Sequence, residues 1–462
     1  MFKKTLFIIC LFGSINAVFA QQEWKHGRLQ VTKDGHYLQY EDGTSFFWLG
    51  DTGWELFHRL KKEEIEKYLE NRRQKGFNVI QAVILAEFDG LRKPNQYGET
   101  PLKDLDPTQP NEKYFELVDW TVQQAMKKNM FMGLLPTWGD KVIKLWGQGP
   151  EIFTESNAYR YGKWLGNRYR SFQNIIWILG GDRPAYNDSV DKREIWRSMA
   201  RGISEGSDQK AIITYHPWGE SSSTKYWPAE PWLNIHMLQS GHAKKDNPVW
   251  EWIKRDREMI PAKPILDGEP NYEDHPVNWN NKNGYFRDYD VRRQCYRSVF
   301  AGACGVTYGN QAMWQFYSER EEAVAYPERS WIETLDRPGA FQVGYLKKLI
   351  ESRSVTDRIP DQKIIIEGQG EKIDYITAFR DAKNKYCMVY IPVGKKFSAD
   401  LSFLSADQVR VWWFDPRKGE AGKPIILTKG PVMSFTPPTL GIENDWVLIV
   451  DDASTKFLQP GK

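Results

Sequence analysis

The stretch Ile175-Ile-Trp-Ile-Leu-Gly-Gly-Asp182 has the composition of a buried strand that breaks at two glycines and is followed by an isolated acid. Later in the chain, Pro264-Ile-Leu-Asp-Gly-Glu269 repeats this arrangement. Short apolar, β-branched runs that end at glycine are typical of strands inside a parallel sheet. Each acid should therefore emerge where a buried strand meets a loop, which in a (β/α)8 barrel is the rim that carries catalytic residues.

The chain up to about residue 310 alternates between helical and strand patterns. We expect eight strands, at residues 46–50, 78–83, 131–135, 175–179, 211–215, 233–238, 264–266 and 305–308. Segments with helical spacing separate most of them, at residues 61–75, 114–128, 159–170, 195–204, 250–259 and 291–301. Eight such units predict a closed (β/α)8 TIM barrel. A doubly wound open sheet is the alternative, but no glycine-rich phosphate loop follows the first strand.

The character of the sequence changes after about residue 355. Four short β-rich runs, at residues 375–379, 386–391, 409–414 and 446–450, are separated by turn signals with no helical pattern between them. This pattern predicts a small antiparallel β-sandwich. We therefore expect a signal peptide at residues 1–20, a (β/α)8 catalytic domain at residues 21–354 and a C-terminal β-sandwich domain at residues 355–462.

The first twenty residues have the pattern of a secretory signal peptide. Lys3 and Lys4 precede an apolar stretch at residues 6–12, and small residues precede Gln21. The pattern predicts a periplasmic or extracellular protein, and the apolar stretch is too short to span a bilayer.

Without Lys3 and Lys4, the 63 basic residues become 61, against 60 acidic residues. This balance gives no electrostatic reason to expect nucleic acid or an anionic membrane as a partner. The sequence gives no indication of the oligomeric state.

Asp182 and Glu269 form the candidate catalytic pair, because the cleavage of a glycosidic bond needs two carboxyl groups. Retaining enzymes hold these groups about 5–5.5 Å apart and inverting enzymes about 6.5–9.5 Å apart, and the sequence leaves both spacings open. Each acid also has a structural explanation. Asp182 could pair with Arg183 in a turn, and Glu269 could hydrogen-bond at the rim. Their matching positions after two strands favour catalysis.

Other polar and aromatic side chains also fall near the predicted strand ends. The candidate substrate-binding residues are Asp51, Trp54, Glu87, Trp138, Arg183, His216, Trp218, His236, Tyr272, Gln311 and Trp314. Asp51 or Glu87 could instead be the catalytic acid, and structural roles at the rim are an equal alternative for the polar residues. Tryptophan rings could stack on sugars, although core packing explains most of the 20 tryptophans. Because no HxH or HExxH spacing is present, we expect no metal and no cofactor.

Four stretches resemble the apiosidase-like catalytic domain of glycoside hydrolase family 140. They are Phe47-Trp-Leu-Gly-Asp-Thr-Gly-Trp54, Lys75-Gly-Phe-Asn-Val-Ile80, Trp177-Ile-Leu-Gly-Gly-Asp182 and Leu266-Asp-Gly-Glu-Pro270. Val411-Trp-Trp-Phe-Asp-Pro-Arg417 resembles a small domain, described as collagen-binding, that is usually attached to it. The resemblance implies a barrel that cleaves glycosidic bonds of apiose in pectic, rhamnogalacturonan-type side chains of plant cell walls by a retaining mechanism. It also implies an aspartate acid/base and a glutamate nucleophile, at the positions of Asp182 and Glu269.

Other functions remain open at this point. The same fold could act on another pentofuranoside or plant glycan, because loops around the pocket set the specificity. The acids could also only bind sugar hydroxyls in a non-catalytic glycan- or matrix-binding protein. An esterase or protease is disfavoured because the sequence has no GxSxG motif.

Overall fold

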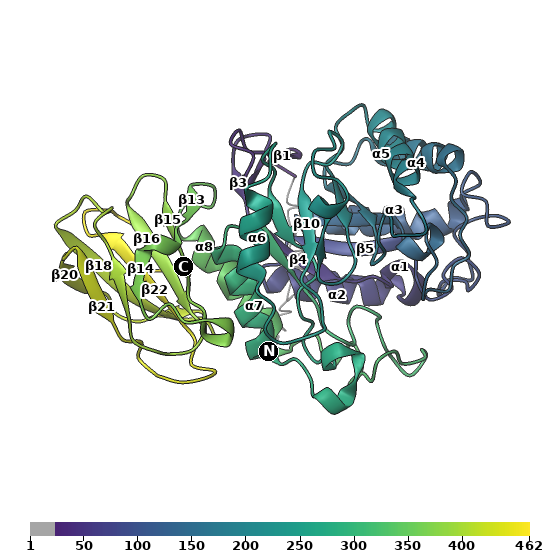
Figure 1. Ribbon diagram of the computed structural model, residues 1–462. Helices are drawn as coiled ribbons and strands as arrows, with labels where there is room; N and C mark the ends of the chain where they lie inside the picture. The colour runs from purple at the N-terminus through teal and green to yellow at the C-terminus, as the bar shows by residue number, and fades with distance from the viewer. Residues whose placement is uncertain (1–23) are drawn as a thin grey trace, which may run out of the picture.

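A computed structural model describes residues 24–462 of the chain. The expected signal peptide, at residues 1–20, lies outside the described residues. Figure 1 shows two parts, a barrel surrounded by helices and a set of antiparallel strands that the C-terminal part of the chain forms beside it.

Eight parallel strands form the barrel, which confirms the predicted (β/α)8 fold. They are β4 (Trp48–Thr52), β5 (Val79–Leu85), β6 (Phe131–Thr137), β7 (Ile175–Gly180), β8 (Ile213–His216), β10 (His236–Gln239), β11 (Ile265–Asp267) and β12 (Gly305–Tyr308). Their order in the sheet is β8-β7-β6-β5-β4-β12-β11-β10. A parallel bridge between Thr214 and Ile235 then joins the two ends and closes the barrel.

Alternation along the strands separates the inside of the barrel from its helical coat. On β5, Val79 and Val83 pack with other inward-facing residues of the strands. Their neighbours Ile80, Ala82 and Ile84 belong instead to the larger core that the helices cover. The near-continuous apolar runs in the sequence arise because both faces of these strands are buried.

The helices follow the strands as predicted, with two additions, α1 and α8. The helices are α2 (Lys62–Gln74), α3 (Glu112–Lys127), α4 (Glu155–Tyr169), α5 (Arg193–Gly206), α6 (Val249–Arg257), α7 (Asp288–Phe300) and α8 (Pro338–Glu351), together with the short α1 (Leu56–Arg59). The sequence analysis does not predict α8, whose Gly339 and Gly344 weaken the helical pattern.

The connection between β8 and β10 contains no helix. It forms the short strand β9 (Ser221–Ser222), which pairs antiparallel with β10, and the 3₁₀ turn η2 (Ser223–Lys225). The regular strand–helix repeat is therefore interrupted on this side of the barrel.

Three strands precede the barrel, β1 (Leu29–Val31), β2 (Leu38–Tyr40) and β3 (Ser45–Phe46). The C-terminal part is the predicted antiparallel β-sandwich. One sheet contains β13 (Arg358–Pro360), β15 (Thr377–Asp381), β16 (Tyr386–Ile391), β22 (Trp446–Asp452), β18 (Gln408–Asp415), β19 (Glu420–Ala421) and β20 (Ile425–Thr428). The other contains β14 (Ile365–Glu367), β17 (Phe397–Asp400) and β21 (Val432–Phe435).

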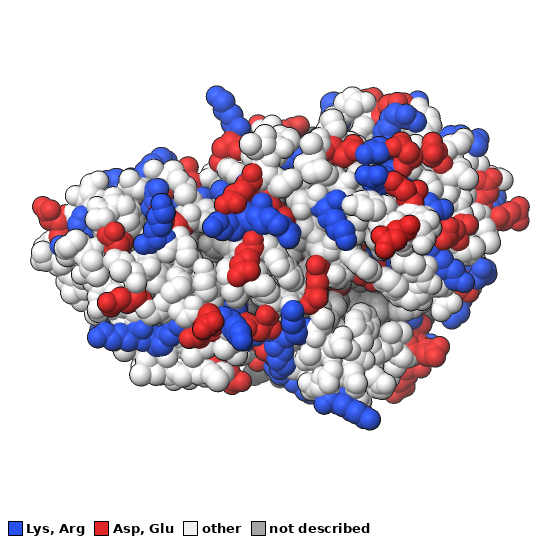
Figure 2. Space-filling model, viewed as in Figure 1, with Lys and Arg blue, Asp and Glu red and all other residues white. Residues whose placement is uncertain are grey.

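The face shown in Figure 2 carries mixed charges, and the three cysteines of the described residues are buried. Figure 2 shows basic and acidic side chains interspersed over the face viewed, as the near-neutral net charge leads one to expect. Cys295, Cys304 and Cys387 are buried free thiols. Among residues 24–462, no helix is long and apolar enough to cross a membrane.

A buried ion pair joins the barrel to the sandwich. Arg292 on α7 donates from Nε and Nη2 to the two carboxylate oxygens of Asp445, both at 2.8 Å. The two side chains are 2% and 0% exposed. The Tyr390 hydroxyl donates to the same carboxylate at 3.0 Å. Because both charges are out of water, each depends on the other.

Asp445→Ala is therefore expected to lower the free energy of unfolding by about 3–5 kcal/mol, since it removes the buried carboxylate that Nε and Nη2 of Arg292 contact and leaves only the partly exposed Asp288 at 3.2 Å as a counter-charge. Urea unfolding followed by circular dichroism measures this change. Lys383→Ala is the control, because Lys383 is 73% exposed in its 2.8 Å pair with Asp357. An exposed pair contributes about 0–1 kcal/mol. Similar losses in the two variants would contradict a structural role for the buried pair.

Candidate active site

A left-handed turn after β7 places Asp182 at the rim of the barrel. Gly180, Gly181 and Asp182 have φ angles of 85°, 117° and 51°. A Cβ atom on Gly180 would lie 2.2 Å from the carbonyl oxygen of His216, so this close approach requires glycine. The Asp182 side chain, 24% exposed, emerges beyond the turn.

Glu269 lies at the same end of the barrel, two residues after β11, and its side chain is 7% exposed. His216 Nε2 lies 2.7 Å from Oε2 of this carboxylate. His242 Nε2 and Gln239 Nε2 lie 2.9 Å and 3.0 Å from Oε1. Glu269 is thus surrounded by nitrogen donors from β8, β10 and the loop after β10.

The two acids have pKa values that move in opposite directions. Burial tends to raise the pKa of Glu269, but the contacts with His216 and His242 outweigh it and lower this pKa to about 2. Burial, followed by the charge of Glu269, raises the pKa of Asp182 to about 6, and Arg183 opposes this rise. An ionised carboxylate therefore lies near a carboxyl group that can hold a proton. This is the pattern expected of a nucleophile and a proton donor.

His216 connects the two acids. Its Nδ1 accepts a hydrogen bond from the backbone N–H of Asp182 over 3.4 Å. Nδ1 is then unprotonated, so the ring proton lies on Nε2, which faces Glu269. The rings of Trp54 and Trp138 pack against the imidazole, with centroids at 5.4 Å and 5.9 Å. This packing fixes the orientation of His216.

A cavity of about 270 Å³ opens beside Asp182. Its lining residues are Trp146, Asp182, Trp218, Gly219, Glu220, Gln239, His242, Ala243, Asn278 and Trp279. Gln239 Oε1 and His242 Nδ1 are buried here and have no hydrogen-bond partner within the described part of the chain. The cavity therefore offers aromatic walls and free acceptors, which together suit the ring faces and hydroxyl groups of a sugar.

Most of the residues expected from the sequence surround the acid pair. Trp54 donates from Nε1 to the Tyr272 hydroxyl at 3.0 Å, and the Tyr272 ring lies 4.3 Å from that of His242. Trp314 lies behind the cavity wall, with its ring 6.4 Å from that of Trp279.

Arg183 and Glu87 lie next to Asp182. Arg183 Nη1 donates to Asp182 Oδ2 at 3.2 Å, and its Nη2 donates to Glu87 Oε1 at 3.4 Å. Burial raises the pKa of Glu87 to about 8. Glu87 is therefore a neutral hydrogen-bonding group at neutral pH.

Two of the expected residues lie away from the site, which corrects the sequence analysis. Asp51 is fully buried and faces α2, where it accepts hydrogen bonds from Arg72 Nε at 2.5 Å and the Tyr68 hydroxyl at 2.6 Å. His236 begins β10 and therefore lies at the opposite end of the barrel, with Nδ1 3.1 Å from Ser223 Oγ. Both residues have structural roles.

The expectation that Gln311 binds the substrate is also wrong. Its amide nitrogen donates to the backbone carbonyl groups of Val324 and Ala325 at 2.8 Å and 2.7 Å. Its oxygen accepts from Trp314 Nε1 at 3.1 Å. Gln311 thus holds the loop after β12 and does not present its amide to the cavity.

Sequence reasoning missed four residues of the site. Gln239 ends β10 and His242 follows it, so the strand-end rule could have found both. Trp146 and Trp279 lie in loops with no periodic pattern, and no sequence signal marks them. These two residues are 58% and 49% exposed.

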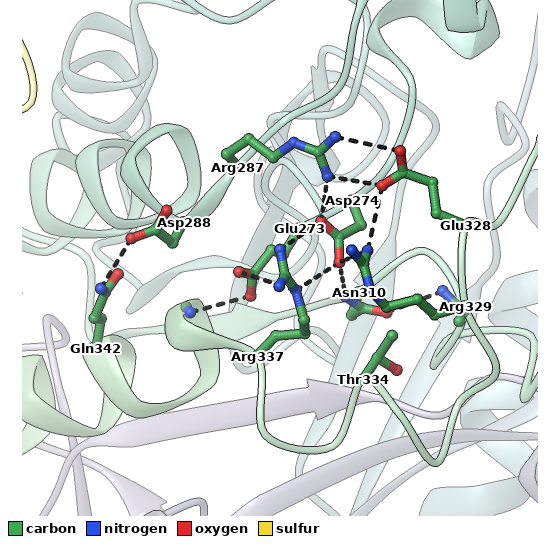
Figure 3. Close-up of polar contacts among 12 residues, drawn as sticks. Glu273, Asp274, Arg287, Asp288, Asn310, Glu328, Arg329, Thr334, Arg337 and Gln342 are labelled. Atoms are coloured by element: carbon green, nitrogen blue, oxygen red, sulfur yellow. Dashed lines mark hydrogen bonds and ion pairs between the residues drawn. The ribbon is translucent and has the colours of Figure 1, made fainter.

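Ion pairs fix the loop after β11, which carries Tyr272 and Trp279 (Figure 3). Asp274 is 3% exposed and accepts from Arg287 Nη1 at 2.6 Å and Arg337 Nη2 at 2.9 Å. Arg337 belongs to the segment that follows β12. The network therefore joins two rim loops and holds the wall of the cavity in place.

The chain matches known families and structures along nearly its whole length. Residues 32–357 match the family described as "Apiosidase-like, catalytic domain", and residues 359–451 match the "Putative collagen-binding domain of a collagenase". The chain is 32% identical to a glycoside hydrolase family 5 protein from Bacteroides vulgatus, with 95% of each chain covered and a TM-score of 0.87. A second structure, described as "Glycoside hydrolase", is 33% identical, with 94% of this chain and 99% of that chain covered and a TM-score of 0.86. Comparison with curated proteins gives no match.

Replacement of Asp182 by asparagine is expected to stabilise the folded protein at high pH. Because burial raises its pKa from 3.8 to about 6, the folded state loses stability as the pH rises and the buried group ionises. At pH 8, neutral asparagine removes a cost of at most about 3 kcal/mol, at about 1.4 kcal/mol per pKa unit. The gain shrinks as the pH falls toward 4. Urea unfolding at pH 8 and pH 5 measures it.

Asp208→Asn is the matched control for this comparison. Asp208 is exposed and has a similar left-handed φ, 55° against 51° for Asp182, so asparagine suits both backbones. The control should show no gain at either pH. A gain in Asp182→Asn that is the same at pH 5 and pH 8 would rule out the ionised carboxylate as its cause.

Proposed function

We propose that this chain, which belongs to the family of apiosidase-like catalytic domains and is a glycoside hydrolase, is a retaining apiosidase. It would belong to glycoside hydrolase family 140, which the four sequence stretches around Trp54, Ile80, Asp182 and Glu269 resemble. One observation carries the proposed mechanism. A buried, ionised Glu269 and a protonatable Asp182 contact the same histidine at the rim of the barrel.

In the first step, a carboxylate oxygen of Glu269 attacks the anomeric carbon while Asp182 donates its proton to the departing oxygen. The bond between the anomeric carbon and the leaving group breaks, and a glycosyl ester of Glu269 forms. Asp182, now ionised, then takes a proton from water, whose oxygen attacks the anomeric carbon. The ester bond breaks, which releases the sugar and restores both carboxyl groups.

The neighbouring residues support each charge state. His216 and His242 lie against the Glu269 carboxylate and lower its pKa, so Glu269 is ionised before the attack. Trp146, Trp218 and Trp279 line the cavity and would supply flat faces for the sugar. The buried rings of Trp54, Trp138, Tyr272 and Trp314 would hold His216 and the cavity wall in place, and Glu87 and Arg183 would orient Asp182. The cavity of about 270 Å³ is below the usual range of about 300–1,000 Å³ for ligand pockets. A small sugar such as a pentofuranose fits that size.

The substrate we propose is an apiose-bearing side chain of pectic rhamnogalacturonan, in the plant cell wall. The amino-terminal pattern at residues 1–20 supports secretion to the periplasm or the exterior, where such a polymer is met. For the β-sandwich we propose a stabilising role. This role rests on the buried pair between Arg292 and Asp445.

Glu269→Gln is expected to abolish turnover and to leave the fold intact, because an amide is too weak a nucleophile to form the ester. Chromatography of the products from a panel of pectic oligosaccharides measures turnover, and circular dichroism checks the fold. Glu251 is an exposed residue of α6, so the Glu251→Gln variant is the control and should cleave at the wild-type rate. Full activity of Glu269→Gln would refute the assignment, and release of another pentofuranose by the wild type alone would correct the substrate.

The rate should depend on pH through both acids. As the pH rises through about 6, Asp182 loses the proton it donates, so kcat/KM should fall. Removal of the donor in His242→Ala should raise the pKa of Glu269 and move the acidic limb of the profile to higher pH. Initial rates between about pH 3 and about pH 9 give the alkaline limb of both proteins. Because the pKa of Glu269 is about 2, the acidic limb of the wild type lies below this range, and only the shifted limb of the variant should enter it. An acidic limb that stays in place would remove His242 from the mechanism.

A further inference from the structure

A second cavity lies where the barrel lacks a helix. Between β8 and β10 the chain forms only β9 and η2, so no helix covers this flank of β10. The cavity occupies this position, has a volume of about 610 Å³ and is lined by Leu238 of β10 and Trp252 of α6. Its volume lies within the range of about 300–1,000 Å³ that is usual for small-molecule sites.

The second cavity adjoins the first. Trp218, Gly219 and Glu220 line both of them. On the side of Asp182, the Trp146 ring lies 6.3 Å from the Trp218 ring, at an interplanar angle of 20°. The two cavities therefore lie next to each other along Trp218, between Asp182 and Trp252, and together they are called the groove below.

The lining of the second cavity suits a carbohydrate. Trp218 and Trp252 are partly exposed indoles, which can stack on the apolar faces of sugar rings. Ser221 and Thr224 add hydroxyl groups. Arg255 is exposed at the edge, with its side chain 58% accessible, and can bind hydroxyl or carboxylate oxygens. Flat apolar faces with hydrogen-bonding groups between them are what a chain of sugars requires.

We propose that this groove binds the leaving-group part of an oligosaccharide, so that the sugars beyond the cleaved bond extend from Trp218 to Trp252. The direction follows from Asp182, which lines the first cavity next to Trp218 and protonates the leaving oxygen. This inference rests on the proposed function. It deepens that function, because it makes the enzyme selective for a sugar attached to a longer chain.

Two substrates test the groove, 4-nitrophenyl apioside and an apiose-bearing oligosaccharide prepared from rhamnogalacturonan. The measured quantity is the ratio of kcat/KM for the oligosaccharide to kcat/KM for the nitrophenyl glycoside. Trp252→Ala should lower this ratio about tenfold, because one stacking contact of the longer chain is lost. Glu251→Ala, an exposed change on the same helix, should leave the ratio as it is in the wild type.

Trp252 also packs beside Leu238 and Ile253, so Trp252→Leu is a second variant that retains the apolar contact without the flat ring. If circular dichroism shows that the Trp252→Ala variant is unfolded, the Trp252→Leu variant tests the groove in its place. The same fall in the ratio of the two kcat/KM values is then expected. Wild-type cleavage of both substrates with an unchanged ratio in the folded Trp252 variant overturns the groove alone. Failure of the wild type to cleave either substrate overturns the proposed function, and the groove with it.

Discussion

The site depends on the need to hold one negative charge, that of Glu269, out of water. A buried carboxylate without partners would cost several kcal/mol and would take up a proton instead. Here His216, Gln239 and His242 supply the partners, and they come from β8 and from the end of β10. These two elements are neighbours only because the bridge between Thr214 and Ile235 closes the barrel. The closed barrel is therefore what allows the Glu269 carboxylate to be both buried and ionised.

The same charge acts on Asp182. After burial, the charge of Glu269 is the largest cause of the raised pKa of Asp182. A carboxyl group that can hold a proton and an ionised carboxylate thus arise from one arrangement, because the stabilised charge of Glu269 disfavours a second charge on Asp182. The left-handed turn at Gly180 and Gly181, and the hydrogen bond from the Asp182 backbone to His216, fix this geometry. Arg183 limits the rise, so the acid stays within the pH range where a protein functions.

The sequence predicted the barrel, the sandwich and the position of both acids at the rim, because buried parallel strands leave a strong apolar signal. The rule that rim residues follow strands works for Asp182, Glu269 and His216. It fails for Asp51, since a residue in a strand can face the helices as well as the barrel axis, and Asp51 faces Arg72. It fails for His236 because the strand begins there, and a difference of a few residues in a strand boundary decides between the two ends of the barrel.

The tryptophans of the groove illustrate a different limit. Trp146 and Trp279 lie in loops whose conformation depends on distant contacts, such as the ion pairs of Asp274, so local patterns give no indication of them. The second cavity has a similar origin. An antiparallel partner, β9, satisfies the exposed edge of β10 with two residues, where a helix would have covered the flank with apolar side chains. A short connection thus leaves surface that the regular fold would bury. That surface, which adjoins the cavity beside Asp182, is the one on which the proposed binding of a longer chain rests.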